Sequence, residues 1–503
     1  MNLFLYVALT AYFTALCNSE NVFNRVFRQV AETINYDKSS SDQEEGTTTA
    51  PWNPLNWFIP KLNAIPYNPD TDLGTCEIAA RHGYPCEAHV VITEDGYLLT
   101  IHRIPCGRIG CEHVGKRGSG QPVFLQHGLL SSSADWLLSG PEKALGFILA
   151  DAGYDLWLGN ARGNTYSKRH ISIRHDDSRF WDFSFHEMAL YDLPAELDYI
   201  YKIKGIENYS ANNASDYPHS LVYVGHSMGT TMLFAMLSLR PEYNSKIRAV
   251  MALAPVAYMS KVKSPIRLLA PFSKDVEILS VRNRIDYYDS NQQKNEYTNN
   301  VPNWVDYIAE TLLNRVSLSL LMVAKFLGAN EFLPQNKILQ FLAKYGCELT
   351  EAERYICENT VFVLCGFDKA QYNETLMPVI FGHTPAGTST KTVVHYAQEI
   401  HEKGNFQYFD YGTKENIVRY GQENPPHYQL QNISTPIALF YAQNDWLAGP
   451  EDVSLLFDKL HRSTIGMFKV PFDSFNHVDF IWGKDAPTLV YSKMLEVMSR
   501  FQN

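Results

Sequence analysis

The most constraining feature of this chain is a serine flanked by glycines, placed between an apolar strand pattern and an apolar helix pattern. Residues 221–224 are apolar and rich in β-branched and aromatic side chains, which is typical of a strand buried on both faces. Residues 230–237 form an apolar run of helical length. Between them, Gly225-His226-Ser227-Met228-Gly229 reads Gly-x-Ser-x-Gly, whose glycines allow a strained turn that lifts the serine to the tip of a sheet. This context predicts that Ser227 is a nucleophile and not part of a plain turn.

Strand and helix patterns alternate along the first half of the chain. A hairpin is expected over 89–103, around the Asp-Gly turn at 95–96. The other expected elements are strands at 122–126, 154–158, 249–253, 436–441 and 467–471, and helices at 142–152, 185–201 (interrupted by Pro194) and 486–500. This alternation predicts an α/β fold, with a mostly parallel central sheet and helices on both faces.

Strand patterns disappear from about residue 257 to residue 424, where helical or irregular segments dominate. We expect an α-helical cap and lid over residues 257–429, inserted into a core made of residues 72–256 and 430–503. Upstream, residues 18–71 form an extension that contains a polar, low-complexity linker.

A serine nucleophile needs a neighbouring base and a third group that orients the base. On a strand-to-helix turn of this kind, the acid and then the histidine follow the serine along the chain. Asp445 and His477 follow the two last expected strands and are the candidates. Their rivals are Asp452, Asp479, Asp485 and His461.

An oxyanion formed at Ser227 needs two backbone N–H donors. The residue after the nucleophile, Met228, supplies one, and the loop after the strand at 122–126 supplies the other through Leu129. A tight turn with a packed leucine is the alternative interpretation of His127-Gly128-Leu129.

The first 17 residues are uncharged and apolar and end in small residues, as in a secretory signal peptide, although a basic start is missing. No other stretch is apolar over the length of a membrane span. We expect a protein that is secreted or, alternatively, lysosomal. The sequons at Asn208, Asn213, Asn373 and Asn432 are glycosylation candidates in that setting.

Seven cysteines remain beyond the signal segment. Cys76/Cys86, Cys106/Cys111 and Cys347/Cys357 lie close together in sequence, and Cys365 is left over. Three local disulfides and one free thiol fit an oxidising compartment, and other pairings stay open.

The composition is that of a globular protein, with 45% hydrophobic and 19% charged residues. A net charge of −11 without a Lys/Arg cluster argues against nucleic acid as a partner. Protonation of all sixteen histidines would make the net charge positive, which fits an acidic compartment, but scattered surface histidines explain their number equally well. Cysteines and histidines show no zinc-type spacing, so neither a metal nor an organic cofactor is expected.

From about Cys76 to the C-terminus, the chain resembles the acid lipase family, which includes gastric lipase and lysosomal acid lipase. The motifs that carry this resemblance are His127-Gly-Leu-Leu, Asp155-Leu-Trp-Leu-Gly-Asn-Ala-Arg-Gly-Asn-Thr, Tyr191-Asp-Leu-Pro-Ala, Gly225-His-Ser-Met-Gly-Thr-Thr, Leu253-Ala-Pro-Val-Ala, Cys365-Gly-Phe-Asp, Pro385-Ala-Gly-Thr-Ser, Asn444-Asp-Trp-Leu-Ala and Asn476-His-Val-Asp-Phe-Ile-Trp.

The resemblance implies an α/β-hydrolase that cleaves neutral-lipid esters, triacylglycerol first, at a lipid–water interface through a serine acyl-enzyme. It places the triad on Ser227, Asp445 and His477 and the oxyanion donors on Leu129 and Met228. It also implies a cap disulfide Cys347–Cys357, with Cys365 as the free thiol.

Two alternatives remain beside that function: a narrower esterase acting on steryl or other acyl esters, and a lipid-binding protein without activity. The chain also departs from the family pattern. The best-known members carry Gln at the position of Met228, and residues 275–314 form a longer, polar segment. The N-terminal extension and Cys76, Cys86, Cys106 and Cys111 are further additions.

Overall fold

The computed structural model of the chain describes residues 67–111, 120–205, 220–267, 330–333, 364–401 and 405–502. The expected signal peptide, most of the extension, Asn208, Asn213, the pair Cys347/Cys357 and the 275–314 segment lie outside these residues. Within the described part of the chain, no helix combines the length and the apolarity needed to cross a bilayer.

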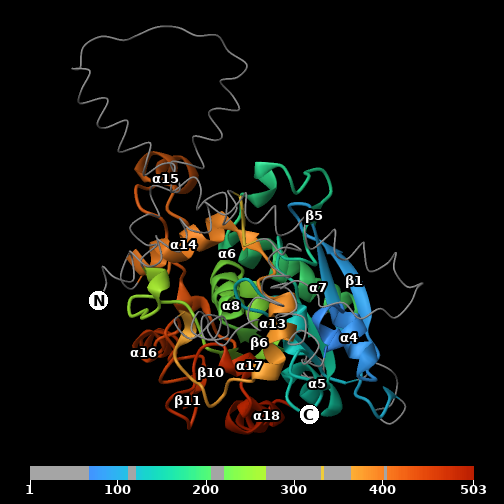
Figure 1. Cartoon of the computed structure of the whole chain (residues 1–503). Coiled ribbons are helices and arrows are strands. Elements are labelled where there is room, and N and C mark those ends of the chain that lie inside the picture. The colour runs from blue at the N-terminus through green and yellow to red at the C-terminus, as the bar shows by residue number, and fades with distance from the viewer. Residues whose placement is uncertain are drawn as a thin grey trace, which may run out of the picture. The chain divides into compact units, whose positions relative to one another are not determined.

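A nine-stranded sheet forms the centre of the described structure (Figure 1). Its order is β1 (Glu87–Ile92), β2 (Tyr97–Ile104), β4 (Asp155–Leu158), β3 (Pro122–Gln126), β6 (Leu221–His226), β7 (Ile247–Leu253), β10 (Ile437–Tyr441) and β11 (Thr464–Lys469), and β5 (Arg169–His170) pairs with β2. The strands from β4 to β11 run parallel, whereas β1 and β2 form an antiparallel hairpin and β2 is antiparallel to β4. The mostly parallel sheet that the sequence predicted is confirmed.

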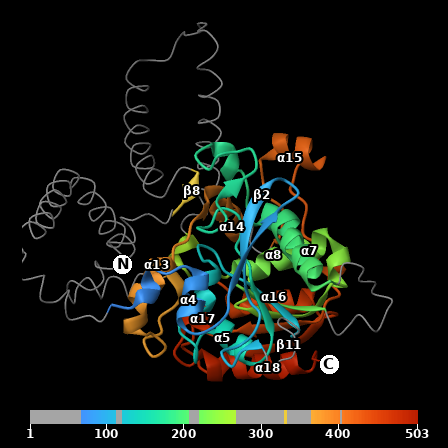
Figure 2. The ribbon, with the colours of Figure 1, turned by 90° about the vertical axis from the view of Figure 1, so that its right-hand side faces the viewer.

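The central strands are apolar because both faces of the sheet are covered. Every residue of β3, β4 and β6 is buried. Figure 2 shows α5 (Leu145–Asp151) and α18 (Ser492–Ser499) on one side of the sheet, and α7 (Leu193–Lys204) and α8 (Met228–Leu239) on the other. The remaining helices around the sheet are α4 (Thr75–Arg81), α16 (Pro450–Lys459) and α17 (Asp479–Trp482).

The helix expected over 185–201 is continuous in space but changes its winding before Pro194. It consists of α6 (Phe185–Glu187), a π-helical turn η6 (Met188–Asp192) and then α7. Proline has no N–H for the carbonyl four residues earlier, Leu190, and Arg240 donates to that carbonyl instead. The helix expected over 142–152 begins later, at Leu145, and its end before Gly153 is as expected.

The chain between β7 and β10, which are neighbours in the sheet, carries the inserted segment. Its described helices are α13 (Met377–His383), α14 (Thr390–His401) and α15 (Thr413–Tyr420). The expectation that strands are absent there was wrong in one detail, because β8 (Glu331–Phe332) and β9 (Thr388–Ser389) form a short antiparallel ladder. Two residues per strand are too few to leave a periodic signal in the sequence.

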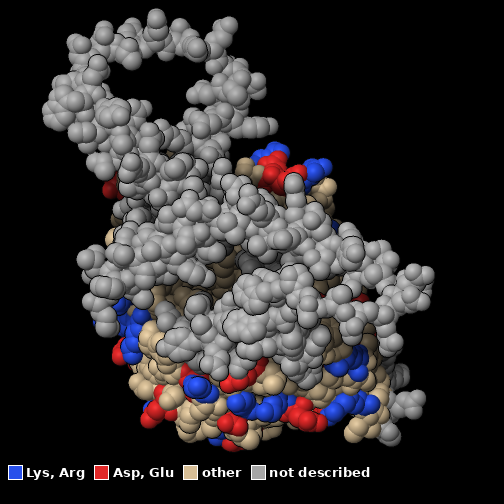
Figure 3. Space-filling model, in the orientation of Figure 1, with Lys and Arg blue, Asp and Glu red and all other residues tan. Residues whose placement is uncertain are grey.

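Two of the three expected local disulfides are confirmed. Cys76 is bonded to Cys86 and Cys106 to Cys111, and Cys365 is a free, buried cysteine. On the face shown in Figure 3, acidic and basic side chains of the described surface lie intermixed, in keeping with the scattered charges of the sequence.

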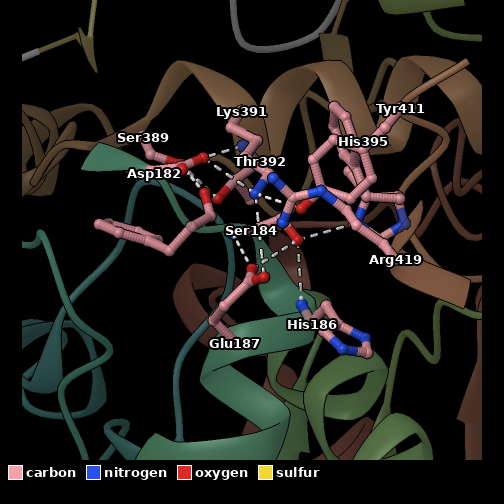
Figure 4. Close-up of polar contacts among 12 residues, drawn as sticks. Asp182, Ser184, His186, Glu187, Ser389, Lys391, Thr392, His395, Tyr411 and Arg419 are labelled. Atoms are coloured by element: carbon pink, nitrogen blue, oxygen red, sulfur yellow. Dashed lines mark hydrogen bonds and ion pairs between the residues drawn. The ribbon is translucent and has the colours of Figure 1, made fainter. Parts of the chain in front are cut away.

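A buried polar cluster fastens α14 to the core beside α6 (Figure 4). The Lys391 ammonium binds the Asp182 carboxylate at 3.1 Å and the Tyr411 hydroxyl at 2.7 Å, and it lies 3.8 Å from Glu187. Burial alone would lower the pKa of Lys391, but these neighbours outweigh burial and raise it. Burial would raise the pKa of Glu187, yet Lys391, His186 and the backbone N–H of Ser184 together outweigh burial and hold that pKa at about 2.

Replacing Lys391 with Met is expected to lower the free energy of unfolding by roughly 3 kcal/mol, because it removes the cation that compensates two partly buried carboxylates. The matched control is Lys493→Met, whose partner Glu496 is 52% exposed, and we expect a change below about 1 kcal/mol there. Thermal and urea unfolding would measure both variants. Equal small changes would show that the cluster does not hold α14 in place.

Candidate active site

The turn between β6 and α8 holds Ser227 in a strained backbone conformation, with φ of 53° and ψ of −119°. A Cβ atom on Gly229 would lie 2.3 Å from the carbonyl oxygen of Gln126, at the end of β3. A Cβ atom on Gly225 would lie 3.0 Å from the carbonyl carbon of Gly229. The two glycines of the motif are therefore required by close approach of backbone to backbone.

Hydrogen bonds on both sides of Ser227 hold this conformation. Its N–H donates to the carbonyl of Leu253 on β7 at 3.1 Å. Its carbonyl accepts from the Thr230 N–H at 2.8 Å and from the Thr230 hydroxyl at 2.6 Å. These hydrogen bonds fix the backbone from which the Ser227 side chain extends, at the carboxyl end of β6.

The structure brings Ser227, His477 and Asp445 together in one chain of hydrogen bonds. His477 Nε2 lies 2.8 Å from Ser227 Oγ, and His477 Nδ1 lies 2.8 and 3.0 Å from the two Asp445 oxygens. Both Asp445 and His477 are buried. A carboxylate at Nδ1 favours the tautomer with the proton there, which leaves Nε2 free to accept the serine proton.

Asp445 follows β10 and His477 follows β11, at the carboxyl ends of neighbouring parallel strands. Asp445 Oδ1 accepts from the backbone N–H groups of Leu447 (2.9 Å) and Ala448 (2.7 Å), which fixes the carboxylate. The carbonyl of Cys365, in the inserted segment, accepts from both Trp446 N (3.3 Å) and His477 N (3.4 Å). The Cys365 carbonyl therefore connects the loop that carries Asp445 with the loop that carries His477.

The two expected oxyanion donors lie on either side of the serine. Met228 begins α8, and a Cβ on Gly128, next to Leu129, would lie 3.2 Å from Ser227 Cβ. Among the described residues, the N–H groups of Leu129 and Met228 donate to no protein acceptor. The His127 ring holds this loop, since Nδ1–H donates to the Gly128 carbonyl at 2.8 Å and Nε2 accepts from Ala161 N at 3.1 Å. Burial lowers the pKa of His127 to about 4, so the ring stays neutral.

His226, inside the Gly-x-Ser-x-Gly motif, holds the catalytic histidine loop. Its Nε2–H donates to the backbone carbonyl of His477 at 2.9 Å. Burial, with a smaller contribution from His477, lowers the pKa of His226 to about 3. A neutral ring keeps one protonated nitrogen for this hydrogen bond and adds no charge beside the base.

None of the rival acids or histidines is hydrogen-bonded to this chain of residues within the described structure. Asp452 binds Ser260 Oγ and Lys261 N, Asp485 binds the amide of Gln371, and Asp479 accepts from Asn476 N. His461 is exposed and bonded to a neighbouring backbone carbonyl.

Other serine–histidine contacts lie away from Ser227, and one of them is between His102 and Ser133. His102 Nδ1 is 2.9 Å from Ser133 Oγ, but Ser133 is fully buried, and its hydroxyl also meets Thr75 and Asn160. The polar contacts of His102 are with Ser133 and the Asn160 amide, and no ion pair between His102 and a carboxylate is found among the described residues. We interpret this contact as internal packing of polar groups and not as a reactive site.

Two glycosylation candidates are within the described residues. Asn432 is exposed and Asn373 is half-buried, with its side-chain oxygen accepting from the Thr375 hydroxyl of the same sequon at 2.9 Å. Both are at the surface.

Sequence reasoning missed several groups that hold the site. The roles of His127, His226 and Cys365 were not predicted, although each lies in or beside a motif that was singled out. Their contacts join positions far apart along the chain, so only a three-dimensional arrangement reveals them.

Comparison with known proteins agrees with this geometry. Residues 75–140 match the model of a partial alpha/beta-hydrolase lipase region, and residues 121–307 match that of the alpha/beta hydrolase fold. Gastric triacylglycerol lipase of Rattus norvegicus is 36% identical over 86% of this chain and 93% of its own length. Lipase 3 of Drosophila melanogaster is 37% identical over 84% of this chain and 91% of its own length. The lysosomal acid lipase/cholesteryl ester hydrolase of Macaca fascicularis is 34% identical over 88% of this chain and 94% of its own length.

The chain belongs to the acid lipase family. Its sheet is that of an α/β-hydrolase, as the resemblance implied.

The substitution Gly229→Ala is expected to destabilise the protein by about 2 kcal/mol or more, because its Cβ would overlap the Gln126 carbonyl and push α8 away from β3. The control is Gly449→Ala, where the nearest atom to an added Cβ is 3.5 Å away and a change below about 1 kcal/mol is expected. Thermal unfolding of both variants is the measurement. An unchanged midpoint for Gly229→Ala would mean that the turn does not depend on this contact.

Proposed function

We propose that this protein is a lipase that hydrolyses carboxylic esters of neutral lipids through a covalent acyl-enzyme. The observation that carries the proposal is the hydrogen-bonded chain Ser227–His477–Asp445, beside two backbone N–H groups that have no described protein acceptor. In this proposal Ser227 is the nucleophile, His477 the general base and Asp445 the residue that orients it. Leu129 and Met228 form the oxyanion hole.

The reaction follows from the positions of these atoms. His477 Nε2 takes the proton of Ser227 Oγ as the oxygen attacks the ester carbonyl carbon. The resulting oxyanion accepts hydrogen bonds from Leu129 and Met228, and Asp445 stabilises the imidazolium. His477 then gives its proton to the leaving alcohol, and water repeats the sequence to release the fatty acid and restore Ser227.

The substrate class is supported by the names of the relatives, which include gastric triacylglycerol lipases and a lysosomal acid lipase/cholesteryl ester hydrolase. We propose triacylglycerol as the main substrate and steryl esters as the alternative. The same relatives, together with two disulfides in the described structure, support an oxidising location that is extracellular or lysosomal.

We further propose the domain division made from the sequence, with the segment between β7 and β10 acting as a cap over the core. An apolar cap that opens at a lipid surface would confine hydrolysis to the lipid–water interface.

Ser227→Ala is expected to abolish hydrolysis of emulsified trioleoylglycerol and cholesteryl oleate between pH 4 and 8. A fluorophosphonate probe should label the wild-type protein on Ser227 and leave the variant unlabelled. Ser133→Ala is the control, because it removes another buried, histidine-bonded serine and should keep both hydrolysis and labelling. Hydrolysis that survives Ser227→Ala would exclude this mechanism, and an inactive but lipid-binding wild type would favour the lipid-binding alternative.

Action at an interface can be tested separately with tributyrin, which forms an emulsion above its solubility limit. We expect the rate per mole of ester to rise steeply as the concentration crosses that limit. A smooth saturation curve through the limit would instead identify an esterase acting on dissolved substrate.

A further inference from the structure

Two buried carboxyl groups lie against each other behind the loop that carries His477. Asp368 belongs to the inserted segment and Asp479 begins α17, and they are 2% and 5% exposed. Their side chains lie close enough together for one hydrogen bond between them. Two carboxylates contain only acceptors, so this contact requires one proton held between them.

The surrounding hydrogen bonds agree with a shared proton. Asp368 Oδ1 accepts from the backbone N–H groups of Ala370 (3.0 Å) and Gln371 (3.3 Å). Asp368 Oδ2 is buried and receives no N–H or hydroxyl donor from the described residues. A proton on Asp479 supplies this missing donor, while Asp479 Oδ2 accepts from Asn476 N at 2.7 Å.

The pair connects the two segments that hold the reactive histidine. Next to it, the Asn476 amide donates to the Gly366 carbonyl at 2.9 Å, and the Cys365 carbonyl accepts from His477 N at 3.4 Å. Separation of Asp368 from Asp479 would therefore pull on the backbone on both sides of His477.

We propose that Asp368 and Asp479 are positioning residues for His477, and that the active site keeps its geometry only while the pair retains its shared proton. The inference rests on the proposed ester hydrolysis and adds a cause for its loss at higher pH. When Asp479 releases its proton to solvent, two adjacent carboxylates repel each other beside the carboxylate of Asp445. The inserted segment and the histidine loop then separate.

The charges around the pair favour the protonated form. Burial raises the pKa of Asp479 well above its usual value, the Asn476 N–H opposes the rise, and Asp368 and Asp445 add to it. Burial also raises the pKa of Asp368, against the N–H groups of Gln371 and Ala370.

The other titratable groups near Asp368 and Asp479 do not compensate the negative charge that the pair would carry without its proton. Cys365 is a buried thiol whose own pKa is raised by burial and by Asp445 and Asp479, and Asp485 is bonded to the Gln371 amide. The basic residues Lys369 and Lys484 are exposed. Because the folded pKa of Asp479 is raised, the pair stabilises the fold fully below the unfolded value near 4, and this stability is lost as the pH rises through the folded pKa.

The test uses Asp368→Asn and Asp479→Asn in the full-length protein. In each variant the amide oxygen can replace the accepting oxygen and the amide N–H can replace the shared proton, so the hydrogen bond no longer depends on pH. Values of kcat/KM for a soluble 4-nitrophenyl butyrate would be measured from pH 4 to 9. We expect the alkaline midpoint of the kcat/KM profile to move up by at least one pH unit in both variants. Above the wild-type midpoint, kcat/KM of the variants should then be about tenfold higher than that of the wild type, and the acid limb should be unchanged.

Asp473→Asn is the matched control, because Asp473 lies in the same loop, is 82% exposed and should give the wild-type profile. A wild type without an alkaline decline, or an unchanged midpoint in two folded variants, would overturn the inference. If neither variant folds, the wild type decides: its thermal midpoint must fall reversibly over the same pH range as its activity. A wild type that hydrolyses no ester at any pH would instead refute the proposed function.

Discussion

The backbone contact between Gly229 and Gln126 is the constraint on which the site depends. It lets α8 start directly against the end of β3, so the turn at Ser227 lies beside the loop that carries Leu129. The strained φ of Ser227 is held by hydrogen bonds to Leu253 and Thr230. Because β3, β6 and β7 are neighbours in one parallel sheet, the positions of the nucleophile and of the proposed oxyanion donors are not independent.

The inserted segment takes part in the site as well as lying next to it. The Cys365 carbonyl is shared between the loops of Asp445 and His477, and the Asn444 amide donates to both the Phe367 and Ser474 carbonyls. Gly366, with φ of 117°, passes so close that a Cβ would lie 2.2 Å from the Asn444 carbonyl oxygen. The loops that carry Asp445 and His477 are thus held together by residues 365–367, which belong to the segment inserted between β7 and β10.

The parts of this arrangement that depend on local sequence could be predicted, and the parts that depend on long-range contacts could not. The turn at Ser227 was predictable because strand, glycines and helix are contiguous, and Asp445 and His477 because each follows an apolar strand. The late start of α5 and the π-helical turn before Pro194 are small shifts that tertiary packing decides. The contact of His226 with the His477 carbonyl and that of Asp368 with Asp479 join residues more than a hundred positions apart, and neither has a periodic or motif signal.

The titration of buried groups gives a different account of acid tolerance from the one suggested by the number of histidines. Burial lowers the pKa values of His102 and His127 to about 4 and those of His226 and His395 to about 3, so these four rings stay neutral in mild acid. Burial also lowers the pKa values of His186 and His383. Unfolded histidines bind protons below about pH 6.5, so these six residues cost stability as the pH falls.

Buried acids act in the opposite direction: burial raises the pKa of Asp135 and of Asp192 to about 6, and that of Glu196 well above its usual value. These acids cost stability as the pH rises from about 4 to 6. Since the two slopes oppose each other over that range, the fold can tolerate mild acid without a surface rich in histidine.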